Sequence, residues 1–221
     1  MTSLEEFKQV IGSGDYVILD TETTGLRDAE IIQIAIISSN GEVLLDTLIK
    51  PIRPIPQDAI RIHGITNEMV ADKLGIMYFY DQIRQLLSGR NVIVFNVAYD
   101  KQILYDSLQI ANIQEVNWDQ ESKWFCAMEA FSELKGEWNA KSKSYKWQSL
   151  SKACDYYNLP IIDAHNALGD CLLTLQVCKS MIGVNVSNTV NFTNNTQTAE
   201  INSMSNNSQQ NSTYKFMYDD I

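Results

Sequence analysis

The fold is indicated most directly by the stretch Tyr16-Val-Ile-Leu-Asp-Thr-Glu-Thr-Thr-Gly25. It begins as a short apolar run typical of a buried strand, and it then turns away at a glycine. Because side chains alternate between the two faces of a strand, Asp20 and Glu22 are expected to project from the same face. Two ionised carboxylates this close repel each other. No Lys or Arg close to them in the sequence would neutralise them, because Arg27 lies beyond the turn. A hard divalent cation with oxygen ligands would neutralise the pair.

The sequence around this stretch alternates between strand and helix patterns. Further strands are expected at Ile31–Ile37, Val43–Ile49, Asn91–Phe95 and Lys123–Ala127, with a hairpin turn at Asn40-Gly41. Helices are expected over residues 76–87, 98–110, 127–134, 148–158 and 166–181. A three-strand meander followed by alternating helices and strands predicts an α/β fold with a mixed β-sheet flanked by helices.

The composition divides the chain into two parts. Asn, Ser, Thr and Gln supply 22 of the 39 residues from Gly183 to Ile221. Because so few large apolar side chains cannot offset the entropy lost on ordering, we expect a single domain over residues 1–182 and a disordered tail over residues 183–221. The aromatic peptide Tyr214–Ile221 breaks the polar pattern. It is either an unstructured end or a segment that docks on a partner protein.

Charge and composition exclude several classes of protein. The 221 residues include 17 Lys and Arg and 27 Asp and Glu, which gives a net charge of −10. An acidic protein lacks the basic stripe that grips duplex nucleic acid, so a nucleic-acid partner would be held at a small local site. The chain shows no apolar run of membrane-spanning length and no signal peptide, so a cytoplasmic protein is expected. Its four cysteines lack CxxC spacing, which excludes zinc-ribbon and disulfide scaffolds.

Two further acids and a histidine occupy the starts of predicted helices. Asp100 falls in the first turn of a helix that follows a buried strand, where the helix dipole favours an acid. Asp170 opens the last helix on its inward stripe, and His165 stands in the turn before it. Each of these residues taken alone is more readily explained as structural than as catalytic.

Taken together, these residues form a specific pattern. It resembles the DEDDh-type 3′–5′ exonucleases of the DnaQ-like superfamily, which include polymerase proofreading subunits, RNase T and oligoribonuclease. The resemblance runs from Tyr16 to Cys178 through four motifs in order, Val17-Ile-Leu-Asp-Thr-Glu-Thr-Thr-Gly25, His63-Gly-Ile-Thr66, Phe95-Asn-Val-Ala-Tyr-Asp100 and His165-Asn-Ala-Leu-Gly-Asp-Cys-Leu-Leu-Thr174. The family often has His in place of Phe95 and Asp in place of Cys126, but neither position belongs to the four acids or the histidine. A ribonuclease H-like fold is implied.

The resemblance also implies a mechanism. It implies a phosphodiester hydrolase that releases 5′-mononucleotides from a 3′ end with two Mg²⁺ or Mn²⁺ ions. It assigns Asp20, Glu22 and Asp170 to one ion, while Asp20 also bridges to the second ion, which Asp100 helps to hold. His165 is expected to take the proton from the attacking water, because histidine titrates near neutral pH. The cations would supply locally the positive potential that the acidic surface lacks.

Substrate-binding residues are expected around this group of acids. Backbone N–H groups from Thr23 through Gly25 to Leu26 are expected to face the terminal nucleotide, with the Leu26 side chain against a base. His63 and Ile65 are expected to flank the same base, although His63 is equally well explained as a buried structural histidine. Asn96, in the motif that ends at Asp100, is the last of the expected substrate-binding residues.

The expected substrate is single-stranded DNA or a frayed 3′ end. One alternative is a 3′–5′ exoribonuclease of the RNase T or oligoribonuclease kind, acting on single-stranded RNA. Another is a catalytically idle recruiting module, although a domain freed from catalysis has no need of four clustered acids. An isolated Ca²⁺-binding domain would explain the acids but not His165.

The Trp- and Tyr-rich stretch Trp138–Trp147 matches no part of the family pattern. One interpretation is that it packs over the helix expected to begin at Gln148. The other is that Trp138, Tyr145 or Trp147 stacks on the bases of a nucleic acid.

Overall fold

A mixed five-stranded sheet forms the centre of the protein in the computed structural model, which describes residues 3–113, 117–161 and 165–184. Its strands are β1 (Val17–Thr23), β2 (Ile31–Ser38), β3 (Val43–Leu48), β4 (Asn91–Val94) and β5 (Lys123–Cys126), in the order β3-β2-β1-β4-β5. β1 pairs antiparallel with β2, and β2 with β3, whereas β4 runs parallel to both β1 and β5. The predicted mixed sheet is confirmed.

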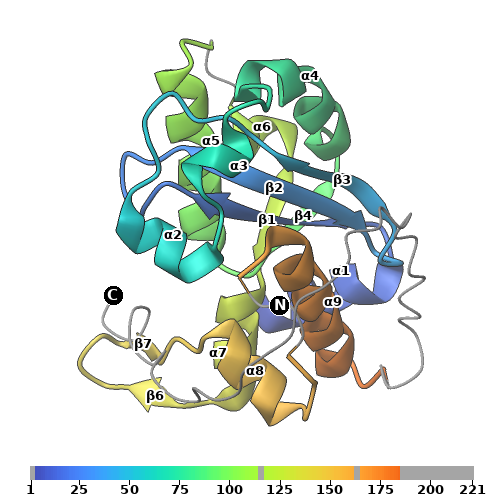
Figure 1. Cartoon of the computed structure of the whole chain (residues 1–221). Helices are drawn as coiled ribbons and strands as arrows, with labels where there is room; N and C mark the ends of the chain where they lie inside the picture. Colours follow the sequence, from blue (N-terminus) through green and yellow to red (C-terminus); the bar gives the residue numbers. More distant parts are fainter. Residues whose placement is uncertain (1–2, 114–116, 162–164, 185–221) are drawn as a thin grey trace, which may run out of the picture.

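Helices cover both faces of this sheet (Figure 1). One face is covered by α1 (Ser3–Ser13), α7 (Ala127–Lys135), α8 (Leu150–Tyr156) and α9 (Ala167–Met181), and the other by α4 (Ile76–Leu87), α5 (Val97–Ile110) and α6 (Trp118–Glu121). Ile18 therefore packs in one apolar cluster and its neighbours Val17 and Leu19 in the other, as strand alternation requires. None of the described helices combines the length and apolar character that crossing a membrane requires.

Two short helices lie beside the sheet near the end of β1. They are α2 (Gln57–His63) and α3 (Asn67–Val70), and they pack with Ile32 of β2 in a third apolar cluster. Helix α2 begins after Pro56 and ends at Gly64, whose φ of 74° is the left-handed conformation that glycine adopts without steric cost. The pattern of the sequence does not predict α2 or α3, because tertiary packing rather than strong intrinsic propensity stabilises such short helices. Helix α1 is not predicted either.

The stretch from Trp138 to Trp147 contains a two-stranded hairpin of β6 (Trp138–Asn139) and β7 (Ser144–Tyr145) between α7 and α8. Trp138 is 57% exposed and Trp147 is 54% exposed. More than half of each tryptophan side chain is therefore open to solvent, and the interpretation that this stretch packs over the following helix stays a prediction. Helix α8 is shorter than predicted, since Ser149 accepts a hydrogen bond from the Lys152 N–H as its N-cap and fixes its start at Leu150.

The last described helix, α9, ends at Met181. The predicted tail lies outside the described residues from residue 185 onward, and so does the aromatic peptide Tyr214–Ile221. The division of the chain into residues 1–182 and 183–221 stays a prediction.

Candidate active site

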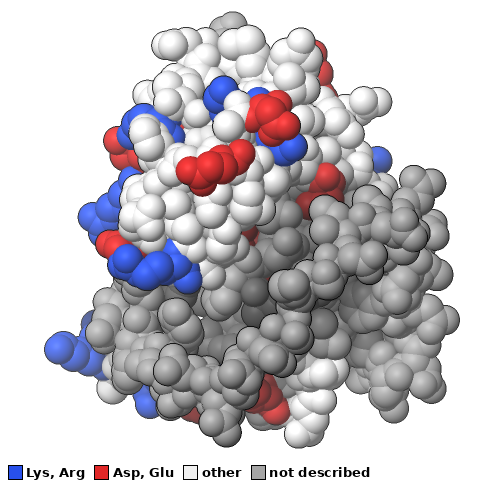
Figure 2. Space-filling view, viewed as in Figure 1, with Lys and Arg blue, Asp and Glu red and all other residues white. Residues whose placement is uncertain are grey.

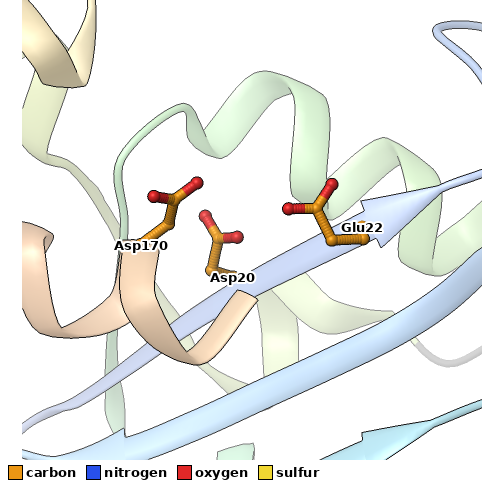
Figure 3. Close-up of side chains that lie close together, drawn as sticks. All are labelled: Asp20, Glu22 and Asp170. Carbon is orange, nitrogen blue, oxygen red and sulfur yellow. The ribbon is translucent and has the colours of Figure 1, made fainter. Parts of the chain in front are cut away.

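Three carboxylates meet where α9 crosses the end of β1. Asp20 and Glu22 project from the same face of β1, and Asp170 lies in the first turn of α9 (Figure 3). One carboxylate oxygen from each residue lies within 4.8 Å of those of the other two. The structure thus brings together the three acids that the sequence resemblance assigns to one metal ion.

Contacts at its N-terminus hold α9 over the strands. The Asn166 side chain accepts hydrogen bonds from the N–H groups of Leu168 and Gly169 at 3.1 and 3.3 Å, which caps the helix. The N–H of Ala167 donates to the Gln33 side chain at 3.3 Å, and Gln33 stands opposite Glu22 in the β1–β2 register. Because Gln33 joins the start of α9 to β2, it fixes the position of Asp170 above β1. Sequence reasoning missed this residue, and its only signal is a buried amide within an apolar strand.

The fourth acid, Asp100, lies outside this three-carboxylate group. It is 4% exposed in the first turn of α5, and its carboxylate accepts a 2.8 Å hydrogen bond from the Thr21 hydroxyl. Thr21 belongs to β1 between Asp20 and Glu22, so this bond ties the covering helix to the strand that carries both acids. Sequence reasoning missed the role of Thr21, although a hydroxyl between two acids in a buried strand is a usable signal.

Burial is the main cause of raised pKa values in all four acids. It raises the pKa of Glu22 to about 8, of Asp100 to about 7 and of Asp170 to about 6, and the pKa of Asp20 well above its usual range. The charges of the other acids raise the pKa values of Asp20 and Glu22 further. The hydrogen bond from Thr21 opposes the shift at Asp100, and the charge of His165 opposes it at Asp170.

Both histidines of the chain lie near this group. His165 is exposed in the turn before α9 with a φ of 66°, a left-handed conformation in which histidine is enriched among non-glycine residues. His63 ends α2, where its Nδ1 accepts a 3.0 Å hydrogen bond from the Ile65 N–H. Burial lowers the pKa of His63, the backbone of Thr23 opposes this shift, and the charge of His165 adds to it. His63 therefore lies close to both the end of β1 and His165.

The loop after β1 is held in place by α5. The hydroxyls of Thr23 and Tyr99 lie 2.7 Å apart, and both lie within hydrogen-bond distance of the Gly25 carbonyl oxygen, at 2.7 and 2.8 Å. Leu26 follows at 40% exposure, so its side chain is accessible to a ligand. Tyr99 is a further residue that sequence reasoning missed.

The far side of the same loop is closed by Glu30 and Arg53. Glu30 is 5% exposed, and its carboxylate accepts hydrogen bonds from the N–H groups of Ile52 and Arg53 at 2.6 and 3.0 Å. The Arg53 guanidinium contacts Glu30 and Asp28, each at 3.0 Å. These bonds join the loop after β1 to the segment that follows β3.

Two other predicted binding residues lie just after α2 and just before α5. Ile65 is 5% exposed and packs in the apolar cluster with Ile32, so its side chain supports α2 and offers little surface to a base. Asn96 is the residue that precedes α5, and its side chain forms no capping hydrogen bond.

The donor set of this site fits a hard divalent cation. Three carboxylates on two elements offer oxygen ligands, and because burial raises their pKa values, a bound cation would stabilise their ionised forms.

A pH titration of stability without metal tests this electrostatic description. The pKa values of Glu22 and Asp100 are higher in the folded protein than in the unfolded chain. At any pH between the unfolded and the folded value, the folded state therefore binds more protons than the unfolded state. The melting temperature of the metal-free protein is therefore expected to fall from pH 6.5 to 8, by roughly 2–4 °C for each kcal/mol lost. Added Ca²⁺ should reverse most of this fall, because cation binding offsets the repulsion.

The pH window isolates the carboxylates. The lowered pKa of His63 affects stability only below about pH 6.5, and buried thiols such as Cys154, with its pKa raised to about 12, begin to matter above pH 8. Glu22→Gln is the matched variant and should make the profile shallower, with Asp20 and Asp100 accounting for the slope that remains. A melting temperature that is constant or rises across this window would contradict the repulsion described here.

Comparison with known proteins places this site in a family. The Exonuclease model of the RNase T type matches residues 17–178. An uncharacterized exonuclease of Escherichia phage 186, CP81, is 34% identical over 171 residues, which are 76% of this chain and 88% of the phage protein. The PolC-type DNA polymerase III of Thermotoga maritima is 32% identical over 171 residues, which are 75% of this chain but 12% of the polymerase.

A solved structure agrees with this assignment. Exonuclease X in complex with 5′ overhanging duplex DNA has a TM-score of 0.57 and 26% sequence identity, over 76% of this chain and 91% of that chain. The DnaQ-like, ribonuclease H-like architecture predicted from the sequence is thereby confirmed. The chain belongs to the RNase T exonuclease family, and it is a 3′–5′ exonuclease of the DnaQ-like type.

Proposed function

We propose that the protein hydrolyses single-stranded DNA, or the frayed 3′ end of a duplex, to 5′-mononucleotides with the help of two Mg²⁺ or Mn²⁺ ions. The observation that carries this proposal is the group formed by Asp20, Glu22 and Asp170, with Asp100 hydrogen-bonded beside it. Divalent cations held there would polarise the scissile phosphate and lower the pKa of the attacking water. Asp20, Glu22 and Asp170 would hold one cation, and Asp20 and Asp100 the other.

The remaining residues of the site orient the substrate and move the proton. His165 would accept the proton of the attacking water, and its exposed position beside Asp170 suits exchange of that proton with solvent. The loop braced by Tyr99 would present the backbone of Thr23, Gly25 and Leu26 to the terminal nucleotide.

His63 and Asn96 would border the terminal nucleotide from α2 and α5. The half-buried ring of His63 lies beside the end of β1, where the backbone of Thr23 contacts it.

The preference for DNA over RNA rests on the relatives. Exonuclease X was crystallised with DNA, and the Thermotoga protein is named a DNA polymerase. The clustered carboxylates also argue for catalysis and against an idle recruiting module, because a module that only binds a partner gains nothing from carboxylates that repel one another.

The polarity and the substrate are tested together with end-labelled single strands. DNA and RNA of the same sequence, incubated with Mn²⁺, should be shortened from the 3′ end, with DNA cleaved faster. A 3′-phosphate should block hydrolysis because it occupies the position of the terminal hydroxyl, and circular single strands should resist. RNA cleaved faster than DNA would favour the exoribonuclease alternative, while degradation from the 5′ end would contradict the assignment of the site.

A further inference from the structure

The hairpin between α7 and α8 exposes three large aromatic side chains. Trp138 and Tyr145 face each other across the two strands, with ring centroids 5.3 Å apart in an edge-to-face arrangement, and Trp147 follows at the base of β7. Tyr145 is 36% exposed, and the two tryptophans are more than half exposed. Trp147 forms no ring pair with another aromatic side chain of the described residues, and more than half of its surface is accessible to a ligand.

Cross-strand pairing alone does not account for this arrangement. The ring pair of Trp138 and Tyr145 supports a ladder of only two residues per strand, whereas Trp147 lies outside the ladder and forms no ring pair among the described residues. The turn is nevertheless well organised, because the Asn139 side chain accepts hydrogen bonds from the N–H groups of Lys141 and Ser142 at 3.0 and 3.4 Å. The buried side chain of Gln148, next to Trp147, donates a 3.3 Å hydrogen bond to the Lys146 carbonyl oxygen at the base of the hairpin. The aromatic side chains are therefore displayed on a defined scaffold.

The same segment concentrates positive charge on an acidic protein. Residues 135–152 contain five of the 17 Lys and Arg residues and one of the 27 acids. That acid, Glu137, pairs with Lys135 and Lys146. Lys141 and Lys143 in the turn form no ion pair with any described residue. Figure 2 shows Lys and Arg gathered at the left of the view, over the hairpin and over α2.

The hairpin belongs to the layer that covers the catalytic face of the sheet. It is inserted between α7 and α8, which pack with α9 in the apolar cluster on the face that carries Asp20 and Glu22. Helix α8 packs directly against α9, the helix that carries Asp170. In Figure 1 the hairpin extends to the left of the view, the side toward which β1 runs and on which α2 lies.

We propose that hairpin β6–β7 and Trp147 form a second binding surface for single-stranded nucleic acid, which stacks on bases and contacts phosphates on the 5′ side of the terminal nucleotide. Aromatic rings bind every base through its π-face, and lysines neutralise the backbone, so the chemistry of the patch matches a single strand. This inference rests on the proposed function, because it adds a second binding surface for the same strand. It predicts that longer strands bind more tightly than the active site alone permits.

Chain-length dependence tests this surface in the full-length protein. With Mn²⁺, kcat/KM should be higher for an oligothymidylate of about 16 residues than for the thymidine dinucleotide, which is too short to reach the hairpin. Trp147→Ala should raise KM for the long strand about tenfold, with kcat and the dinucleotide kinetics unchanged. Trp147→Phe should restore most of the affinity because a phenyl ring also stacks. The Lys141→Gln/Lys143→Gln variant should reduce the dependence of log KM on log salt by about 0.7 for each phosphate that a lysine no longer neutralises.

Two control variants lie far from the hairpin in sequence and structure. Tyr78→Ala removes a 75% exposed aromatic side chain from α4, and Lys73→Gln removes a lysine in the turn after α3. Neither variant should change the dependence of kcat/KM on strand length. An unchanged KM in Trp147→Ala, or an equal effect on both substrates, would overturn the inference while leaving the exonuclease intact.

A binding titration separates this inference from the proposed function. If the wild-type protein hydrolyses no strand, the proposed function fails, and quenching of tryptophan fluorescence by the long strand in Ca²⁺ then decides about the hairpin. Weaker binding by Trp147→Ala supports the surface. Equal binding by the wild type and Trp147→Ala overturns it. A wild-type protein that sediments as a dimer, together with a Trp147→Ala variant that sediments as a monomer, also overturns it, because the patch would then be an interface between two copies.

Discussion

Replacement of Asp20 by asparagine is expected to lower the rate of hydrolysis by roughly 10³–10⁴-fold while raising the melting temperature of the metal-free protein at pH 8. The rate falls because a metal ligand is removed, and metal ions contribute several kcal/mol of transition-state stabilisation. The melting temperature rises because asparagine has nearly the same shape without a charge, so the cost of burial and the repulsion by Asp100, Asp170 and Glu22 disappear. The measurements are kcat in saturating Mn²⁺ and calorimetry in EDTA.

An exposed aspartate provides the control for this variant. Asp72, in the turn after α3, is 79% exposed, and Asp72→Asn should leave both rate and melting temperature unchanged. If Asp20→Asn lost activity because the metal-free protein unfolded, the carboxylate would be structural, and its assignment as a metal ligand would lose its support.

The opposite effects on rate and stability follow from the way the fold is built. Strand β1 is buried on both faces by helices, yet it carries Asp20, Thr21 and Glu22 at its end. The apolar packing of α9 and α5 holds these acids at distances at which their charges repel. The free energy gained from apolar packing therefore offsets the repulsion among the carboxylates, which lowers the stability of the protein until a cation binds.

The sheet can be predicted from the sequence because its strands carry strong local signals. The run Tyr16–Asp20 and the turn at Asn40-Gly41 indicate a buried strand and a hairpin without reference to the rest of the chain. Helix α1 is not predicted, although Phe7 and Ile11, four residues apart, are the side chains that it buries. Hairpin β6–β7 is not predicted either, because two residues per strand are too few to show a period of two.

The site is predictable only in part. The alternation of side chains along β1 places Asp20 and Glu22 together, and the family resemblance adds Asp170. The residues that position these acids act over long separations, as Thr21 does on Asp100 across 79 residues. No local pattern reveals such a bond, because it depends on which helix covers which face of the sheet.

The proton acceptor is tested by replacing His165. His165→Ala is expected to lower kcat by roughly 10²–10⁴-fold at saturating Mn²⁺, the range that general-base catalysis contributes. The wild-type rate should fall as the pH falls, because a protonated imidazole cannot accept the proton of water, and the variant should lack this dependence. Saturating metal keeps Asp20, Glu22 and Asp170 ionised across the range, so their titration does not obscure the result. Added imidazole should restore part of the activity of His165→Ala but none of that of Asp20→Asn.

The left-handed backbone at position 165 calls for a second variant. Alanine is strained at a φ of 66°, so His165→Ala alters the turn before α9 as well as removing the ring, whereas asparagine tolerates this conformation and offers no basic nitrogen. Equal loss of kcat in His165→Asn and His165→Ala would assign the effect to the missing base. Substantial activity in His165→Asn would instead show that the turn, which sets the position of Asp170, is what the reaction requires. The other histidine gives the contrast, because His63→Ala should act on KM for the terminal nucleotide and leave the pH dependence of kcat in place.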